Sequence, residues 1–171
     1  IITKLYEKAG LKAAIVLCPY KHLVDQWAGE ARKFNFNPLI VHTSRHMWSE
    51  NLNRKLFNLK SGSKDFLMVL TTNQSFAHEF FQSKICHFPR KTLIVADEAH
   101  NLGAKGLRKK LPDSIPWRLA LSATPERWFD DEGTAAIFNY FGPVLKPEFT
   151  LKDAMDCGAL APYRYFPLLV E

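Results

Sequence analysis

Five short apolar stretches alternate with segments of helical periodicity, and this alternation limits the possible folds more than any other feature of the chain. The stretches are residues 13–18 (AAIVLC), 38–42 (PLIVH), 65–72 (DFLMVLTT), 92–97 (TLIVAD) and 118–124 (RLALSAT). Hydrophobicity within each is continuous, which indicates strands buried on both faces, as in a parallel sheet covered by helices. We therefore expect an α/β fold with an open, mostly parallel sheet flanked by helices.

Two of the intervening segments have the pattern of amphipathic helices. In residues 21–34 (KHLVDQWAGEARKF) one stripe carries Leu23, Trp27 and Ala31, with charged residues elsewhere. Residues 49–60 (SENLNRKLFNLK) repeat this arrangement with leucines. On this pattern Trp27 is interpreted as a core residue.

The sequence patterns at the two ends of the chain predict a helix that begins inside a β-α unit and a segment that leaves the domain. Residues 1–12 (IITKLYEKAGLK) have the pattern of a helix end closed by Gly10, without a strand or capping signal before it, so we expect the chain to begin inside a β-α unit. Residues 150–160 (TLKDAMDCGAL) predict a short helix stopped by Gly158. Residues 161–171 (APYRYFPLLVE) predict an extended segment that leaves the domain.

Composition excludes several classes of protein. A chain of 171 residues with 47% hydrophobic content forms a core, and no apolar run approaches the roughly 18 residues of a membrane span. The start lacks the pattern of a signal peptide, so we expect a cytoplasmic protein.

Cys18, Cys86 and Cys157 are too widely spaced to indicate a disulfide framework or a zinc site. The net charge of +6 favours a polyanionic partner such as nucleic acid.

Polar residues gather where each predicted strand ends, which is where open α/β sheets bind their ligands. The residues at these positions, most of them polar, are Pro19, Tyr20, Lys21, Thr43, Ser44, Thr71, Thr72, Asn73, Asp97, Glu98, Ala99, His100, Ser122, Ala123 and Thr124. They predict one functional surface at the carboxyl edge of the sheet.

Asp97 and Glu98 have the residue types that nucleotide hydrolysis requires. A carboxylate binds Mg²⁺ together with phosphate oxygens, and a neighbouring carboxylate orients or deprotonates an attacking water. We assign the first role to Asp97 and the second to Glu98, and expect His100 to hydrogen bond to a neighbouring strand end. The alternative is that the two carboxylates only cap the following helix.

The segment after the last predicted strand supplies possible partners for His100. The hydroxyl groups of Ser122 and Thr124 flank Ala123, and either hydroxyl could bond to His100 or to the acidic pair. Pro125 then forces a turn. Alone, a segment of this kind is more often an ordinary turn that leads into a helix.

The ordered set of motifs resembles superfamily 2 helicases and translocases. DEAH at residues 97–100, followed one β-α unit later by SATP at 122–125, is similar to their motifs II and III. IVLCPYKHLVDQW (15–27) resembles motif Ia, and VLTTNQSF (69–76) resembles the Thr-Thr segment called Ib or Ic. The sequence of the segment LSATPERW is most similar to the DEAH/DExH branch that includes restriction-enzyme subunits and DNA excision-repair proteins.

The resemblance implies a first RecA-like motor domain that uses ATP and Mg²⁺ on a nucleic-acid track, with DNA preferred to RNA. By it, Asp97 would hold the metal, Glu98 would activate water, and His100 with the segment Ser122, Ala123 and Thr124 would couple hydrolysis to movement. The residues implied to contact the nucleic-acid backbone are Pro19, Tyr20, Lys21, Thr71, Thr72 and Asn73.

One departure from the family pattern limits what the chain is expected to do alone. The phosphate loop GxxxxGK[ST] is absent, since no Gly-Lys pair occurs in the 171 residues. We expect residues 1–150 to form a partial first motor domain that starts after this loop, and residues 151–171 to form an exit helix and an extended segment that lead toward the rest of the protein. The resemblance also implies a second RecA-like domain in the full-length protein. The isolated chain is then expected to be inactive. A non-catalytic nucleic-acid or protein docking module of the same fold, and a different P-loop enzyme, stay open as alternatives.

Overall fold

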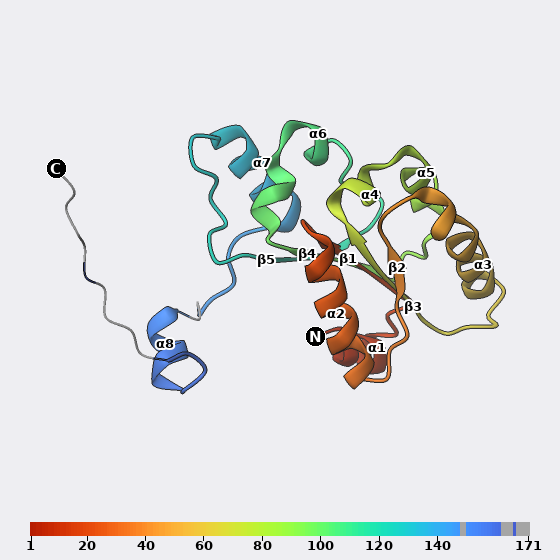
Figure 1. Ribbon diagram of the computed structural model, residues 1–171, viewed down its shortest axis with the longest axis horizontal. Helices are drawn as coiled ribbons and strands as arrows, with labels where there is room; N and C mark the ends of the chain where they lie inside the picture. Colours follow the sequence, from red (N-terminus) through yellow and green to blue (C-terminus); the bar gives the residue numbers. More distant parts are fainter. Residues whose placement is uncertain (148–149, 162–165, 167–171) are drawn as a thin grey trace.

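The sheet has five strands, all parallel, in the order β2-β3-β1-β4-β5. The computed structural model describes residues 1–147, 150–161 and 166. The strands are β1 (Ala13–Cys18), β2 (Leu39–Val41), β3 (Leu67–Thr72), β4 (Thr92–Asp97) and β5 (Trp117–Leu121). The expected α/β architecture with a parallel sheet is therefore confirmed (Figure 1).

Helices cover both faces of the sheet. The α-helices are α1 (Ile2–Ala9), α2 (Lys21–Lys33), α3 (Ser49–Lys60), α4 (Asn73–Ala77), α5 (Glu79–Gln82), α6 (Lys105–Arg108), α7 (Asp131–Phe141) and α8 (Leu151–Asp156). The described residues also form three short 3-10 helices, which are η1 (Arg45–Met47), η2 (Ile85–His87) and η3 (Ala99–Gly103). Side chains of α1 and α2 pack on one face, and those of α3, α5 and α7 pack on the other.

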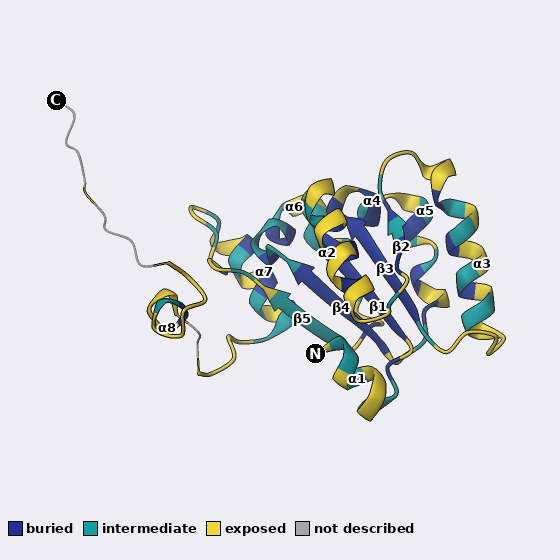
Figure 2. Cartoon of the chain, turned by 60° about the horizontal axis from the view of Figure 1, so that its bottom comes forward, coloured by how far each residue is buried: buried dark blue, intermediate teal, exposed yellow. Residues whose placement is uncertain are grey.

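Strand β1 shows why the apolar runs are continuous. Its alternate residues belong to two different core clusters, with Ile15 and Leu17 packed on one face and Ala14 and Val16 on the other. All six of its residues are fully buried. Burial on both faces, which the sequence predicts, is thus confirmed for the central strands (Figure 2).

Strand β5 differs from this prediction. Its first four residues are only half-buried and Leu121 is exposed, as the teal arrow in Figure 2 shows. Within the described residues β5 pairs with β4 alone, which leaves one of its edges without a neighbouring strand. The strand also ends at Leu121, so residues 122–124 form a loop rather than the end of the predicted strand.

Both predicted helix ends are present. Gly10 closes α1 in the left-handed conformation with φ 66°, which glycine adopts without a steric cost. Helix α8 begins with a capping box between Thr150 and Asp153, and Gly158 follows it with φ 74°. Of the predicted extended segment 161–171, residues 162–165 and 167–171 lie outside the described residues. Among the helices that the structure describes, none combines the length and apolar character needed to cross a bilayer.

Candidate nucleotide and nucleic-acid sites

The acidic pair lies at a sharp change of backbone direction. Asp97 is the last residue of β4, and Glu98 adopts the left-handed conformation with φ 48° and ψ 52°, which is uncommon for residues other than glycine. The Glu98 amide donates a 3.1 Å hydrogen bond to Asp97 Oδ1. The two carboxylates have different partners, since Asp97 Oδ2 accepts from Trp27 and Glu98 Oε2 lies 3.4 Å from His100 Nδ1.

Helix capping does not explain Glu98. The following element, η3, has Glu98 at its N-cap position, but the Glu98 side chain makes no capping hydrogen bond. That side chain is 44% exposed, so water reaches the carboxylate. The capping alternative therefore lacks the contact that it requires.

His100 joins the ends of β4 and β5. The Asn101 side-chain amide donates to the Glu98 carbonyl at 3.0 Å and lies 3.1 Å from His100 Nε2. Because an amide nitrogen only donates, Nε2 accepts, and the imidazole proton of neutral His100 resides on Nδ1. Nδ1 lies 3.1 Å from Ser122 Oγ and donates to it, so the expected hydrogen bond between His100 and Ser122 is present.

The rest of the coupling segment behaves differently from the expectation. Thr124 is exposed and uses its backbone amide, which donates to Ser122 Oγ at 3.2 Å. The Thr124 hydroxyl makes no hydrogen bond to His100 or to the acidic pair within the described residues, because β5 ends at Leu121 and Thr124 lies exposed in the loop that follows. Ala123 is also exposed. Ser122 alone connects this segment to His100.

Arg127 is a second link that the sequence did not identify. Its Nη1 donates to the His100 carbonyl, its Nε donates to Asp130 Oδ2 at 2.7 Å, and its amide donates to Thr134 Oγ1 at 2.9 Å. This guanidinium, followed by the Gly133 amide, lowers the pKa of Asp130 below its usual 3.8. The spacing of Arg127 and Asp130 signals a local ion pair, but no sequence signal reveals the contact with His100.

A glycine leaves the space that Arg127 occupies. A Cβ atom added to Gly103 would overlap the Arg127 side chain and the Gly133 carbonyl. The segment after β4 and the loop after β5 therefore pack directly against each other. Together, Asp97, Glu98, His100, Asn101 and Ser122 are called the acidic cluster below.

Trp27 corrects the sequence interpretation of α2. The helix buries Val24, Ala28 and Ala31, whereas Trp27 is half-buried at the edge of the core. Its indole Nε1 donates a 2.8 Å hydrogen bond to Asp97 Oδ2. Asp97 also lies close enough to Cys18 that its negative charge, after burial, contributes to raising the pKa of this thiol to about 12.

The donor set suits a magnesium ion bound together with phosphate. No group of three or more His, Cys, Asp or Glu side chains in the described part of the chain could hold a metal by itself. Asp97 and Glu98 instead supply hard oxygen atoms from two carboxylates. Mg²⁺ takes one or two carboxylates and completes its octahedron with waters and phosphate oxygens, so these residues fit that ion.

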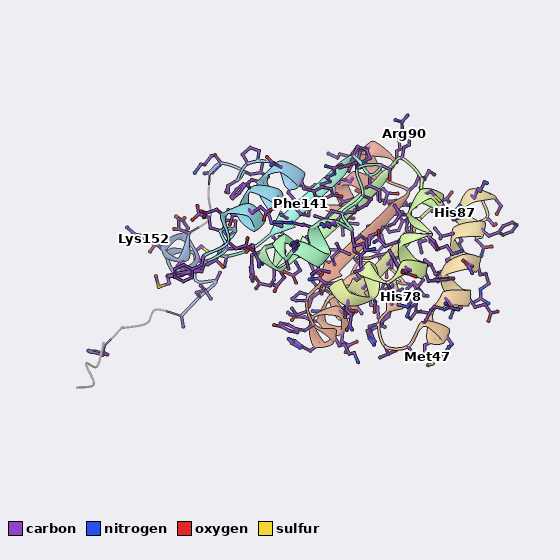
Figure 3. All side chains as sticks on the ribbon, turned by 90° about the horizontal axis from the view of Figure 1, so that it is seen from above. Met47, His78, His87, Arg90, Phe141 and Lys152 are labelled. Carbon is purple, nitrogen blue, oxygen red and sulfur yellow. The ribbon has the colours of Figure 1, made fainter. Side chains whose placement is uncertain are left out.

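The ends of β1, β2 and β3 converge on a second region, here called the groove. A cavity of about 340 Å³ is lined by Pro19, Tyr20, Lys21, Thr43, Arg45, Trp48, Thr72, Gln74, Ser75 and His78. An adjoining hollow of about 640 Å³ extends from Tyr20 and Asn73 to Asn101 and Leu107. Figure 3 shows Met47 and His78 toward one edge of the part that contains the sheet, and Arg90, which precedes β4, at the opposite edge.

The predicted nucleic-acid residues divide into an exposed and a buried set. Tyr20 is 60% exposed and Lys21 is exposed, so both are accessible to a ligand. Thr71 is fully buried and its hydroxyl donates to the Thr72 carbonyl at 3.2 Å, so a direct nucleic-acid contact by the Thr71 side chain is wrong. The reason is that β3 lies between β1 and β2 and stays buried to its last residue.

Thr72 and Asn73 also serve the turn after β3. Thr72 Oγ1 accepts from the Ser75 amide at 3.2 Å and caps α4, and it donates to Ser75 Oγ at 3.1 Å. Asn73 is 5% exposed and its Oδ1 is buried without a hydrogen-bond partner among the described residues. Arg45, Gln74 and His78 are lining residues that the sequence did not single out, because they lie beyond the strand ends in η1, in α4 and directly after α4.

Comparisons with known proteins agree with this architecture. Residues 1–127 match the family described as the type III restriction enzyme res subunit, ResIII. No curated protein matches the chain. A solved structure similar to it is a nuclease-deletion mutant of the Type ISP restriction-modification enzyme LlaGI in complex with a DNA substrate mimic, with a TM-score of 0.52 and 20% identity.

That likeness shows the fold alone. It covers 74% of this chain and 14% of the LlaGI chain, so the chain spans a small part of the length of that enzyme. The sheet and the family match together confirm the expected RecA-like, helicase-like domain and the restriction-subunit branch of superfamily 2. The chain belongs to the ResIII family of type III restriction enzyme res subunits.

Proposed function

We propose that this chain is part of an ATP-dependent helicase or translocase that acts on DNA. The observation that carries the proposal is the hydrogen bond between His100 and Ser122, which joins the strand end bearing Asp97 and Glu98 to the next strand end. DNA is preferred to RNA because the family is one of restriction enzymes and because the similar LlaGI structure contains a DNA substrate mimic.

The acidic cluster supplies the residues for nucleotide hydrolysis. Asp97 would hold the Mg²⁺ of bound ATP, and this ion would neutralise charge on the phosphates. Glu98 is exposed to water and would orient or deprotonate the attacking water. His100 donates its Nδ1 proton toward Ser122 and Glu98, so a change in the Glu98 environment would reach the loop after β5.

The groove supplies the surface for a DNA strand. Helix α2 has Tyr20 at its N-cap without a side-chain capping bond, so the amides of its first turn are available to a phosphate. Lys21 and Arg45 add positive charge at the same cavity, and Tyr20 adds an exposed aromatic ring. Contacts of this kind recognise the backbone and are independent of sequence.

Other segments of the full-length protein would complete the ATP site and the motor. A phosphate loop and a second RecA-like domain are proposed to act together with residues 1–150, and residues 151–171 would lead toward the rest of the protein. Because the 171 residues contain no GxxxxGK[ST] motif, the isolated chain is expected to hydrolyse ATP negligibly.

The test is ATP hydrolysis by the full-length protein with Mg²⁺, measured without nucleic acid, with DNA and with RNA. We expect stimulation by DNA above that by RNA, and loss of hydrolysis in Asp97→Asn. Asp65→Asn, an exposed carboxylate just before β3 and distant from the acidic cluster, is the control and keeps full activity. A full-length protein that binds DNA but hydrolyses no ATP would instead be a docking module.

A further inference from the structure

The predicted metal-holding carboxylate is fixed by donors from two separate elements. Trp27 Nε1 in α2 donates to Asp97 Oδ2 at 2.8 Å, and the Glu98 amide donates to Oδ1 at 3.1 Å. One donor on each oxygen defines the plane of the carboxylate and leaves lone pairs on both oxygens for another ligand. A hydrogen bond from a fixed donor to an ionised acceptor is also stronger than one between neutral groups.

Packing alone does not require this hydrogen bond. Trp27 and Trp117 both contact the core cluster beneath α2 through their rings. Within the described residues, Trp117 makes no indole hydrogen bond, whereas Trp27 directs its N–H at a carboxylate 70 positions away. Substitutions at the two tryptophans can therefore distinguish the effect of ring burial from the effect of N–H donation.

The helix that carries Trp27 also forms a wall of the groove. Lys21, the first residue of α2, lines the cavity at the ends of β1, β2 and β3. Trp27 lies six residues further along the same helix, or about 9 Å at the α-helical rise. Val24 packs into the core between these points and Ala28 directly after them, so one continuous helix, anchored to the core, connects the cavity wall to Trp27.

We infer that Trp27 is a positioning residue that sets the orientation of the Asp97 carboxylate for Mg²⁺ and communicates occupancy of the groove to it through α2. The inference rests on the proposed function. Outer-shell hydrogen bonds of this type hold metal-binding carboxylates in place, and their removal typically weakens metal affinity or activity by about tenfold to 100-fold.

The first experiment compares Trp27→Phe with Trp117→Phe in the full-length protein. Trp27→Phe keeps a ring in the core and removes the N–H donor. We expect the Mg²⁺ concentration for half-maximal DNA-stimulated ATP hydrolysis to rise about tenfold, with the affinity for DNA without nucleotide unchanged. Trp117→Phe is expected to leave the Mg²⁺ requirement unchanged.

The second experiment measures the hydrogen bond without hydrolysis. Full-length protein is labelled with fluorotryptophan, and the ¹⁹F resonance of Trp27 is identified by its loss in a Trp27 variant. We expect this resonance to shift in Asp97→Asn and on addition of a DNA oligonucleotide without nucleotide. The Trp117 resonance is expected to stay in place in both cases.

The outcomes distinguish the inference from the function on which it rests. If the wild-type protein shows Mg²⁺- and DNA-dependent hydrolysis but Trp27→Phe has the wild-type Mg²⁺ requirement, the positioning role is wrong and the proposed function stands. If the Trp27 resonance of the wild-type protein does not shift when DNA is added, the communication through α2 is wrong. This measurement is independent of whether Trp27→Phe folds. A wild-type protein without hydrolysis overturns the proposed function and the inference together.

Discussion

The acidic cluster and the groove lie along the same edge of the sheet but are built in different ways. In the acidic cluster, polar side chains contact one another, since His100 bonds to Ser122 and Asn101 and lies beside Glu98. In the groove, the buried Thr72 side chain caps the turn after β3, while the exposed Lys21 side chain at the start of α2 makes no hydrogen bond or ion pair with the described residues.

This difference indicates how each region responds to change. A substitution in the acidic cluster removes a partner from a neighbouring side chain, so its effect spreads to both strand ends. A substitution of an exposed groove residue is expected to remove one proposed contact with DNA and to leave the fold and stability of the protein unchanged. A substitution of a buried groove residue changes stability first. Four predictions follow this division, from the largest expected effect to the smallest.

Glu98→Gln removes the proposed general base and keeps the shape of the side chain. We expect DNA-stimulated ATP hydrolysis by the full-length protein to fall by about 10²- to 10⁴-fold, the range typical of general acid-base groups, with DNA affinity unchanged. Steady-state hydrolysis and fluorescence anisotropy of labelled DNA measure the two quantities. Glu126→Gln, an exposed carboxylate in the loop after β5, is the control. Undiminished hydrolysis in Glu98→Gln would refute the role given to Glu98.

Ser122→Ala removes the acceptor of the His100 Nδ1 proton. A net contribution of about 0.5–1.5 kcal/mol for one hydrogen bond corresponds to a reduction of up to about tenfold in DNA-stimulated hydrolysis. Binding of DNA is expected to stay unchanged, because Ser122 is not a lining residue of the groove. Ser63→Ala in the exposed turn after α3 is the matched control. An equal loss in both variants would argue against the link.

Thr72→Val tests whether this residue of the groove acts on stability. The substitution keeps the side-chain volume and removes the cap of α4, so the free energy of unfolding should fall by about 1–2 kcal/mol. Urea denaturation measures this change, and Thr124→Val, whose side chain is exposed, should alter the free energy of unfolding little. Wild-type stability in Thr72→Val would mean that the cap is unimportant.

Lys21→Gln tests the exposed part of the groove. We expect a several-fold loss of DNA affinity, the same on different sequences, and a decrease of about one in the slope of log affinity against log salt concentration. Lys33→Gln at the other end of α2, where the lysine pairs with Glu30, serves as the control. A salt slope equal to that of the wild-type protein would exclude a phosphate contact by Lys21.

Much of the fold was predictable from local patterns. The apolar runs identified all five strands, and burial on both faces explains the continuous runs of the central strands β1, β3 and β4, whereas the edge strand β5 is only half-buried. Gly10 marked the end of α1. The bond between His100 and Ser122 was also predictable, because adjacent parallel strands end at the same edge. The functional roles of these residues stay predictions.

Contacts between distant segments were not predictable. Helical periodicity placed Trp27 on the apolar stripe, but only the packing of α2 against β1 and β4 shows that its N–H reaches Asp97. For Arg127 the sequence indicated only a local ion pair with Asp130. Its contact with the His100 carbonyl depends on the space that Gly103 leaves for the Arg127 side chain. The burial of the Thr71 side chain was not predictable, because it depends on the order of the strands in the sheet, which local sequence patterns do not specify.

The sequence by itself determined that the chain forms a parallel α/β sheet and that polar groups gather at one edge, since both follow from the period and length of apolar runs. Only the tertiary structure decided which of those groups are exposed and which are buried. The physical reason is that hydrogen bonds and burial depend on the distances between secondary-structure elements. The pairing of strands sets these distances, and the local sequence patterns that predict each strand do not specify this pairing.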